Sequence, residues 1–133
     1  MAKEVHVQVR QIGDSTSACT ARQHKTLSDR PPAKGGADRG PMGGEMLLMG
    51  LGGCFMSNLL AAIKARQAAI ADVSISLTAT LADAPPRFTT INLSISGSYG
   101  DKDEMEKLVT IAERSCIVAN TLKNAVRLSF EVA

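Results

Sequence analysis

The sequence has 133 residues, of which 44% are hydrophobic and 21% are charged, so it has the composition of one soluble globular domain over residues 1–133. This composition excludes a disordered tail and a multidomain assembly. The net charge is only +2, from 15 basic and 13 acidic residues, and aromatic residues make up 3%. Nucleic-acid binding needs clustered positive charge or aromatic stacking platforms, so we expect no nucleic-acid partner.

The N-terminal residues MAKEVHVQVR lack the apolar segment of a secretory signal. We therefore expect a cytoplasmic protein, whose three cysteines are thiols by default. A structural disulfide is not expected, whereas a catalytic or redox-sensing thiol remains open.

Valines alternate with polar residues over residues 5–10, which predicts a half-buried strand that ends in a turn at Gly13. A hairpin partner is expected over roughly residues 15–26. Proline and glycine are dense over residues 29–44, which indicates a loop within the domain.

Residues 46–63 form an uncharged run of 18 residues with apolar side chains on every face. This pattern predicts a long helix that is covered by protein on all sides. Eighteen residues also reach the lower length limit for a membrane span. Three glycines, Ser57 and Asn58 interrupt the run and strand patterns flank it, so a buried central helix is favoured and no membrane partner is expected.

Two further alternating stretches, residues 73–81 and 91–95, flank the turn residues Asp-Ala-Pro-Pro and predict a second hairpin. Asp101 then starts a helix, with Glu104 in capping-box position. The buried stripe of this helix is expected to comprise Met105, Leu108, Val109 and Ala112.

Ser115 is placed to cap a short helix from Cys116 to about Lys123, and alternation over residues 126–132 predicts a final strand. The element order indicates an α+β fold, with antiparallel sheets and helices on one side. One sheet covers only one face of a helix that is apolar all round. A two-fold dimer that wraps the sheets of both chains around paired helices would cover the rest.

No metal or cofactor site is expected. The two histidines, His6 and His24, lie on strand patterns without ligand spacing. The glycine pairs of residues 35–44 do not form a phosphate-binding or dinucleotide-binding motif.

The cysteines are the remaining candidates for reactive residues. For Cys54 and Cys116, local features leave both a reactive thiol and a packed core residue open. Cys54 lies in LGGCF, where glycines allow close approach, but a cysteine on a buried helix is commonly a small core residue. Cys116 lies in the first turn of a predicted helix, where free N–H groups lower a thiol pKa, although core packing also explains it. Cys19 is interpreted as incidental.

The central segment DRPPAKGGADRGPMGGEMLLMGLGGCF resembles the OsmC/Ohr family pattern. That pattern has D-x-P at a strand end, a loop with a glycine pair, and E-L-L-x-x-L-G-x-C on a long helix. The later segment AERSCIVANTL resembles the family's second-cysteine motif, A-x-x-x-C-x-V-x-x-T-L, and its cysteine follows the first by 62 positions. The two motifs occur in the family order and the resemblance spans nearly the whole chain.

The resemblance implies an OsmC-like fold, in which antiparallel sheets wrap a long buried central helix within an intertwined two-fold homodimer. It also implies a two-cysteine peroxide chemistry. Cys54 would attack the O–O bond of an organic hydroperoxide, and Cys116 would condense with the resulting sulfenic acid. An external dithiol, for example of lipoyl type, would reset the pair without a bound cofactor.

In the organic hydroperoxide resistance branch of the family, an arginine and a glutamate polarise the attacking thiolate. Gly44 stands where that glutamate aligns, and Glu45 follows one position later. Arg10, Arg22 and Arg39 are candidates for the arginine, of which Arg22 is favoured because it lies in the N-terminal hairpin region. A solvated surface charge is the alternative interpretation of each.

The leading hypothesis is a thiol-dependent peroxidase of oxidative-stress defence, with Cys54, Cys116, Arg22 and Glu45 as its site residues. A small-molecule binding module that has lost efficient chemistry is the first alternative. A stress-associated structural dimer with packed cysteines is the second. Peroxide consumption and peroxide-induced crosslinking of the two cysteines separate these hypotheses.

Overall fold

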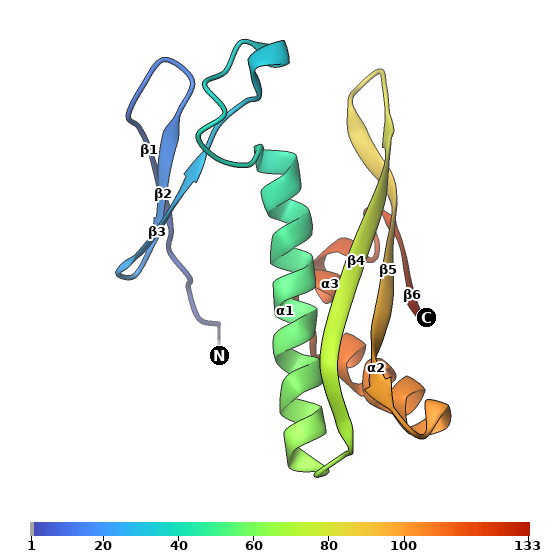
Figure 1. The fold of residues 1–133 in the computed structure, drawn as a ribbon. Helices are drawn as coiled ribbons and strands as arrows, with labels where there is room; N and C mark the ends of the chain where they lie inside the picture. The colour runs from blue at the N-terminus through green and yellow to red at the C-terminus, as the bar shows by residue number, and fades with distance from the viewer. Residues whose placement is uncertain (1) are drawn as a thin grey trace. The chain divides into compact units, whose positions relative to one another are not determined.

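The structure, a computed structural model, describes residues 2–133 and contains two compact units whose boundary lies between Leu47 and Leu48 (Figure 1). The first unit holds three strands, a short 3₁₀ helix and the start of a long helix: β1 (Gln8–Gln11), β2 (Ser17–Ala21), β3 (His24–Ser28), η1 (Pro32–Lys34) and α1 (Gly43–Ala65). The second unit holds the remainder of α1, three strands and two helices: β4 (Ile70–Ala82), β5 (Arg87–Tyr99), α2 (Lys102–Ser115), α3 (Ile117–Leu122) and β6 (Arg127–Val132).

The first unit is a three-stranded antiparallel sheet in the order β1-β2-β3. The expected hairpin partner over residues 15–26 was wrong in one respect, because the chain reverses inside that range and forms two strands. Arg22 occupies the turn with a φ of 56°, a left-handed conformation that two-residue hairpin turns require. The first strand is also shorter than expected and is exposed in this chain, with Val9 66% accessible.

The loop after β3 is held by the buried carboxylate of Asp29. Its oxygens accept hydrogen bonds from the Thr16 hydroxyl at 2.7 Å and from the backbone N–H groups of Arg30 at 2.7 Å and Arg39 at 3.1 Å. Burial alone would raise the pKa of this carboxyl, but the donors, which include Ser15, outweigh it and hold the pKa far below its usual range. Asp29 is therefore ionised, and its hydrogen bonds from Arg30 and Arg39 hold the two ends of the loop together.

The second unit contains a mixed sheet in the order β4-β5-β6. β4 and β5 form the expected antiparallel hairpin, whereas β6 pairs with β5 in parallel. The expectation of purely antiparallel sheets was therefore wrong for the last strand. The chain leaves β5, crosses the sheet through α2 and α3, and returns in the same direction, which is the usual route between parallel strands.

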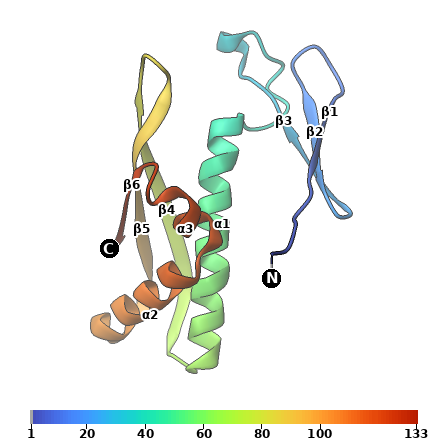
Figure 2. The same ribbon diagram turned by 180° about the vertical axis from the view of Figure 1, so that it is seen from behind.

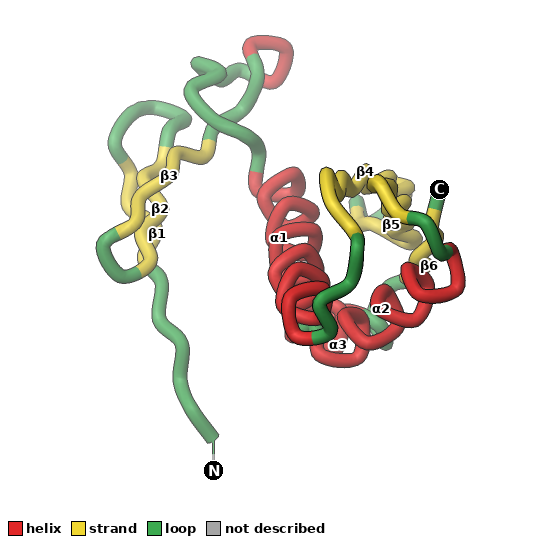
Figure 3. The backbone as a smooth tube through the Cα atoms, turned by 60° about the horizontal axis from the view of Figure 1, so that its bottom comes forward, coloured by secondary structure: helices red, strands yellow, loops and turns green. Residues whose placement is uncertain are grey.

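The three helices pack along one face of this sheet, as the views in Figures 2 and 3 show. On that face Ile91, Leu93 and Ile95 of β5 are fully buried, and the predicted stripe of α2 is buried against them. The Phe55 ring of α1 lies 5.0 Å from that of Phe130 on β6. The opposite face of the sheet is polar: Asn92 donates to Glu131 and accepts from the Ser129 hydroxyl.

Helix α1 confirms the long helix, and, as expected for a single sheet, its own chain covers only one side of it. Its buried residues are confined to one face: Leu51, Gly52, Phe55 and Leu59. Met49 is 54% accessible and Leu60 is 50% accessible. A single sheet can cover only one stripe of a helix, so the remaining apolar surface is open in this chain. By length and composition alone, α1 is also apolar enough to cross a membrane.

Candidate thiol site

Cys54 is placed by α1, at the edge of its buried face. Leu51 and Phe55, within one turn of it, are fully buried against the sheet, and this packing fixes the rotation of the helix. Cys54 itself is half-buried. The Cys54 sulfur therefore lies neither in the core nor fully in solvent.

Cys116 lies at the junction between α2 and α3 and is completely buried. Its extended backbone ends α2, and its sulfur accepts the backbone N–H of Ala119 at 3.5 Å, so Cys116 is the N-cap of α3. The expectation that Ser115 caps this helix was wrong, because Ser115 is still the last residue of α2. A cysteine sulfur here performs the role that a serine oxygen commonly fills.

The fold brings Cys54 and Cys116 into contact despite the 62 positions between them. The Cys54 sulfur lies close to the Cys116 thiol and to the backbone N–H groups of Val118 and Ile117, and all three groups lower its pKa. Both cysteines are free thiols in this structure. Because the contact and both backbone donors belong to the second unit, they form one continuous site.

The surroundings shift the pKa values of the two thiols in opposite directions. Burial raises the pKa of Cys54, but the hydrogen bonds from Val118, Cys116 and Ile117 together outweigh it, so its pKa lies below the ordinary value for a thiol. Burial raises the pKa of Cys116, and a neighbouring Cys54 thiolate raises it further. Cys54 is thus the more acidic thiol of the pair and Cys116 the less acidic one.

The surface beside Cys54 is open. A Cβ atom added at Gly50 or at Gly53 would meet nothing within 4 Å. One turn further along α1, the side chain of Asn58 donates to the backbone carbonyl of Cys54 at 2.9 Å. A small molecule that approaches the sulfur from this side would meet glycine backbone and one amide side chain.

The other two predicted site residues, Arg22 and Glu45, belong to the first unit. Arg22 is exposed in the β2–β3 turn. Glu45 lies in the first turn of α1, where its carboxylate accepts the backbone N–H of Met42 at 2.8 Å. This contact gives Glu45 a capping role at the start of the helix. The participation of both residues in the thiol site stays a prediction.

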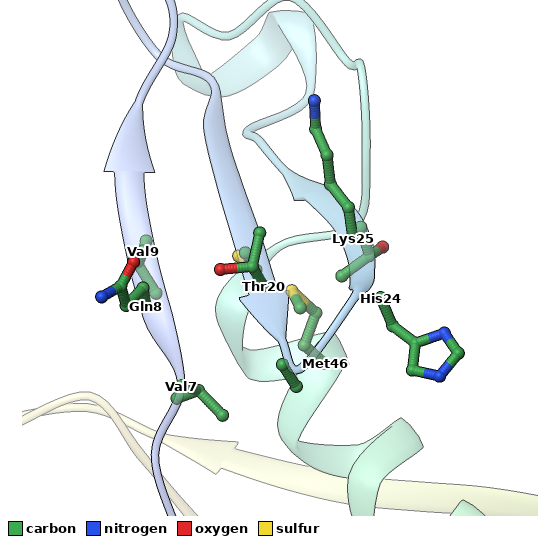
Figure 4. Close-up of a pocket in the computed structure, with 10 residues that line it drawn as sticks. Val7, Gln8, Val9, Thr20, His24, Lys25 and Met46 are labelled. Carbon is green, nitrogen blue, oxygen red and sulfur yellow. The ribbon is translucent and has the colours of Figure 1, made fainter.

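A separate hollow of about 370 Å³ lies in the first unit, against one face of its sheet. Val7, Val9, Cys19 and Met46 are among its mostly apolar lining, and in Figure 4 the side chains of His24 and Lys25 extend away from Met46. Cys19 is half-buried there and does not belong to the Cys54 pair. Within residues 2–133, no three histidine, cysteine or carboxylate side chains are grouped so that they could hold a metal ion.

Sequence reasoning missed two contributors to the thiol site. The backbone N–H groups of Ile117 and Val118 carry no side-chain signal, and only the capped start of the predicted short helix pointed toward them. Asn58 was noted only as a polar interruption of the apolar run. Its spacing of four residues from Cys54 places it on the same helix face, a signal that could have identified it.

The arrangement defines a class of protein: an α+β protein in which a long apolar helix places a thiol of lowered pKa beside a buried second thiol. Solved structures share this fold over nearly their whole length. An OsmC-like protein from Mycoplasma pneumoniae is 21% identical with a TM-score of 0.84, and the match covers 100% of this chain and 96% of that one. The organic hydroperoxide resistance protein OhrB of Bacillus subtilis is 19% identical with a TM-score of 0.72, and the match covers 98% of each chain. An organic hydroperoxide resistance protein from Elizabethkingia anophelis is 16% identical with a TM-score of 0.75, and that match covers 100% of this chain and 97% of that one.

No curated protein matches the chain. The sequence model of the family described as OsmC-like protein matches residues 35–131, which include both cysteines of the site. The chain therefore belongs to the OsmC-like protein family, and the resemblance seen in its two cysteine motifs is confirmed.

Proposed function

We propose that this protein is a thiol-dependent peroxidase that reduces organic hydroperoxides in oxidative-stress defence. The observation that carries the proposal is the contact between a Cys54 whose pKa is lowered and a Cys116 whose pKa is raised. A thiolate is the reactive form of cysteine, and a neutral thiol beside it is suited to the second step. Structural likeness to proteins named for organic hydroperoxide resistance supports the substrate class.

In the first step, the Cys54 thiolate attacks the terminal oxygen of the hydroperoxide R–O–O–H. The S–O bond forms, the O–O bond breaks, and the alkoxide leaves and takes a proton from water to become the alcohol ROH. Cys54 becomes a sulfenic acid. The thiol of Cys116 then attacks this sulfur, a disulfide forms, and water is released. An external dithiol, for example of lipoyl type, reduces the disulfide and is itself oxidised.

The surface near Cys54 suits an apolar substrate. Ile117, whose backbone contacts the Cys54 sulfur, has a side chain that is 74% accessible. As part of the proposal, Arg22 and Glu45 assist the thiolate as the family resemblance implies, and two copies of the chain form a homodimer.

Consumption of cumene hydroperoxide in the presence of a dithiol tests the proposal. The wild-type protein should consume the peroxide over many cycles. Cys54→Ser should lose essentially all activity, because the serine hydroxyl does not ionise at neutral pH. Intact mass after one equivalent of peroxide should show the loss of two hydrogens, with a crosslink between Cys54 and Cys116. Equal rates for the two proteins would refute the proposal, and Cys19→Ser serves as the matched control.

A non-catalytic binding module is the second candidate, and the hollow in the first unit favours it. About 370 Å³ of mostly apolar space lies within the usual size range of small-ligand sites. This function predicts an apolar ligand that protects Cys19 from alkylation. Under it, one equivalent of peroxide would leave Cys54 and Cys116 as free thiols.

A further inference from the structure

Asn58 is an unusual residue for the middle of a helix, because asparagine side chains compete with the backbone for hydrogen bonds. Here its amide nitrogen donates to the carbonyl of Cys54 at 2.9 Å. Side chains on a helix lean toward its N-terminus, so the Asn58 amide lies over the turn that carries Cys54. This hydrogen bond fixes the amide on the helix face that carries Cys54.

The oxygen of the Asn58 amide, Oδ1, accepts no hydrogen bond within the described chain. Among residues 2–133, no donor forms a hydrogen bond to Oδ1 of Asn58. This oxygen is also not sealed from solvent, because every fully buried side-chain oxygen and nitrogen of the half-buried and buried residues has a partner. Asn58 therefore presents an acceptor that is accessible from outside and held in place by the opposite end of its own amide.

Open space for a ligand adjoins Cys54. Gly50 and Gly53 leave the surface of α1 beside Cys54 unobstructed, with nothing within 4 Å of either added Cβ. The backbone donors of Ile117 and Val118 already face the Cys54 sulfur. Asn58 is then the side chain of α1 that offers an amide oxygen on the same helix face as the thiol, one turn away.

We propose that Asn58 is a catalytic residue that binds the hydroperoxide group and aligns it for attack by Cys54. This inference rests on the proposed function and names a further residue for it. The terminal O–H of the hydroperoxide donates to Oδ1 of Asn58. The oxygen that bears this hydrogen is the one that Cys54 attacks, so one hydrogen bond holds the reacting atom near the sulfur. As the S–O bond forms and the alkoxide leaves, that hydrogen stays on the sulfenic acid and keeps its contact with Asn58.

The test compares two reactions of Cys54 in the wild-type protein and in Asn58→Leu, which keeps the side-chain size but removes the amide. Stopped-flow oxidation by cumene hydroperoxide reports on alignment of the substrate. Alkylation by iodoacetamide, which has no O–O–H group, reports on the thiolate alone. We expect oxidation to slow about tenfold, the effect of one lost hydrogen bond, while the alkylation rate and its pH profile stay unchanged.

Ser57→Ala is the matched control, because Ser57 is the exposed polar neighbour on the same turn, and it should leave both rates unchanged. Asn58→Ala provides a second variant in case leucine disturbs folding. Unchanged oxidation in a folded Asn58 variant would overturn the inference alone. A parallel fall in alkylation would overturn it too, because Asn58 would then act on the thiol. A wild-type protein inert toward the peroxide would overturn the proposed function together with the inference.

Discussion

Cys54 and Cys116 are chemically identical side chains that differ in their burial and in the donors around them. The Cys54 sulfur receives two backbone N–H groups and a thiol, whereas Cys116 receives the N–H of Ala119 and faces a negative neighbour. The asymmetry therefore arises from the different burial of the two thiols and from backbone geometry at the α2–α3 junction. It needs no charged side chain from the second unit.

Cys116→Ala tests this asymmetry directly. The substitution removes the thiol that donates to Cys54, so the pKa of Cys54 should rise toward its ordinary value. The midpoint of its alkylation by iodoacetamide, followed by peptide mass mapping from pH 5 to 10, should move to higher pH. One equivalent of peroxide should leave a sulfenic acid that dimedone traps. An unchanged midpoint would show that the Cys116 thiol does not stabilise the thiolate, and Cys19→Ser should behave as wild type.

At the scale of the element, the loop over residues 29–42 depends on a single ionised carboxylate. A carboxyl whose pKa is lowered in the folded state stabilises that state fully above its unfolded pKa of about 4. This stabilisation is lost as the pH falls through the much lower folded pKa of Asp29. Protonation weakens its bonds from Thr16, Arg30 and Arg39.

We therefore expect Asp29→Asn to lower the melting temperature at pH 7, because an amide offers one acceptor oxygen where the carboxylate offers two. The difference from the wild type should stay constant from pH 7 to about 5 and shrink below about pH 4. Thermal unfolding followed by circular dichroism across this range measures it. A melting-temperature difference that grows as the pH falls would contradict the expected pH dependence. Asp14 is exposed, so Asp14→Asn is the control.

Elements with strong local signals could be predicted from the sequence. The α2 cap at Asp101 and the β4–β5 hairpin are such cases, and both are confirmed. The parallel pairing of β6 could not be predicted, because alternation marks a strand without giving its direction. The Cys54–Cys116 contact was implied only by family resemblance, since contacts between residues so distant in sequence have no local signal. The capping sulfur of Cys116 was missed because serine is the commoner cap.

At the scale of the whole molecule, α1 presents an exposed apolar surface. Only 22% of its most apolar 18-residue window is buried in this chain. Exposed apolar surface of this kind marks an interaction site or a membrane contact. A second copy of the chain, related by two-fold symmetry, is the partner that the family resemblance implies.

Met49→Glu tests this interpretation, because a charge at a contact between two α1 helices would oppose association. We expect the wild-type protein to have the mass of a dimer in multi-angle light scattering and the variant to dissociate. Thr110→Glu introduces the same charge on the exposed side of α2 and should remain dimeric. A monomeric wild type, or one that needs detergent for solubility, would contradict the dimer.

The pairing of β5 with β6 has a consequence for the order of folding. The hairpin and α2 form from contacts between near neighbours, but β6 must return across both helices before Phe130 reaches Phe55. Contacts between distant parts of a chain close late, because the entropy of the intervening loop has to be overcome first. The Cys54–Cys116 contact also joins distant parts of the chain, so we expect the two thiols to be apart in a nascent or partly unfolded chain. We therefore expect the reaction with peroxide to begin only after the core of the second unit has folded.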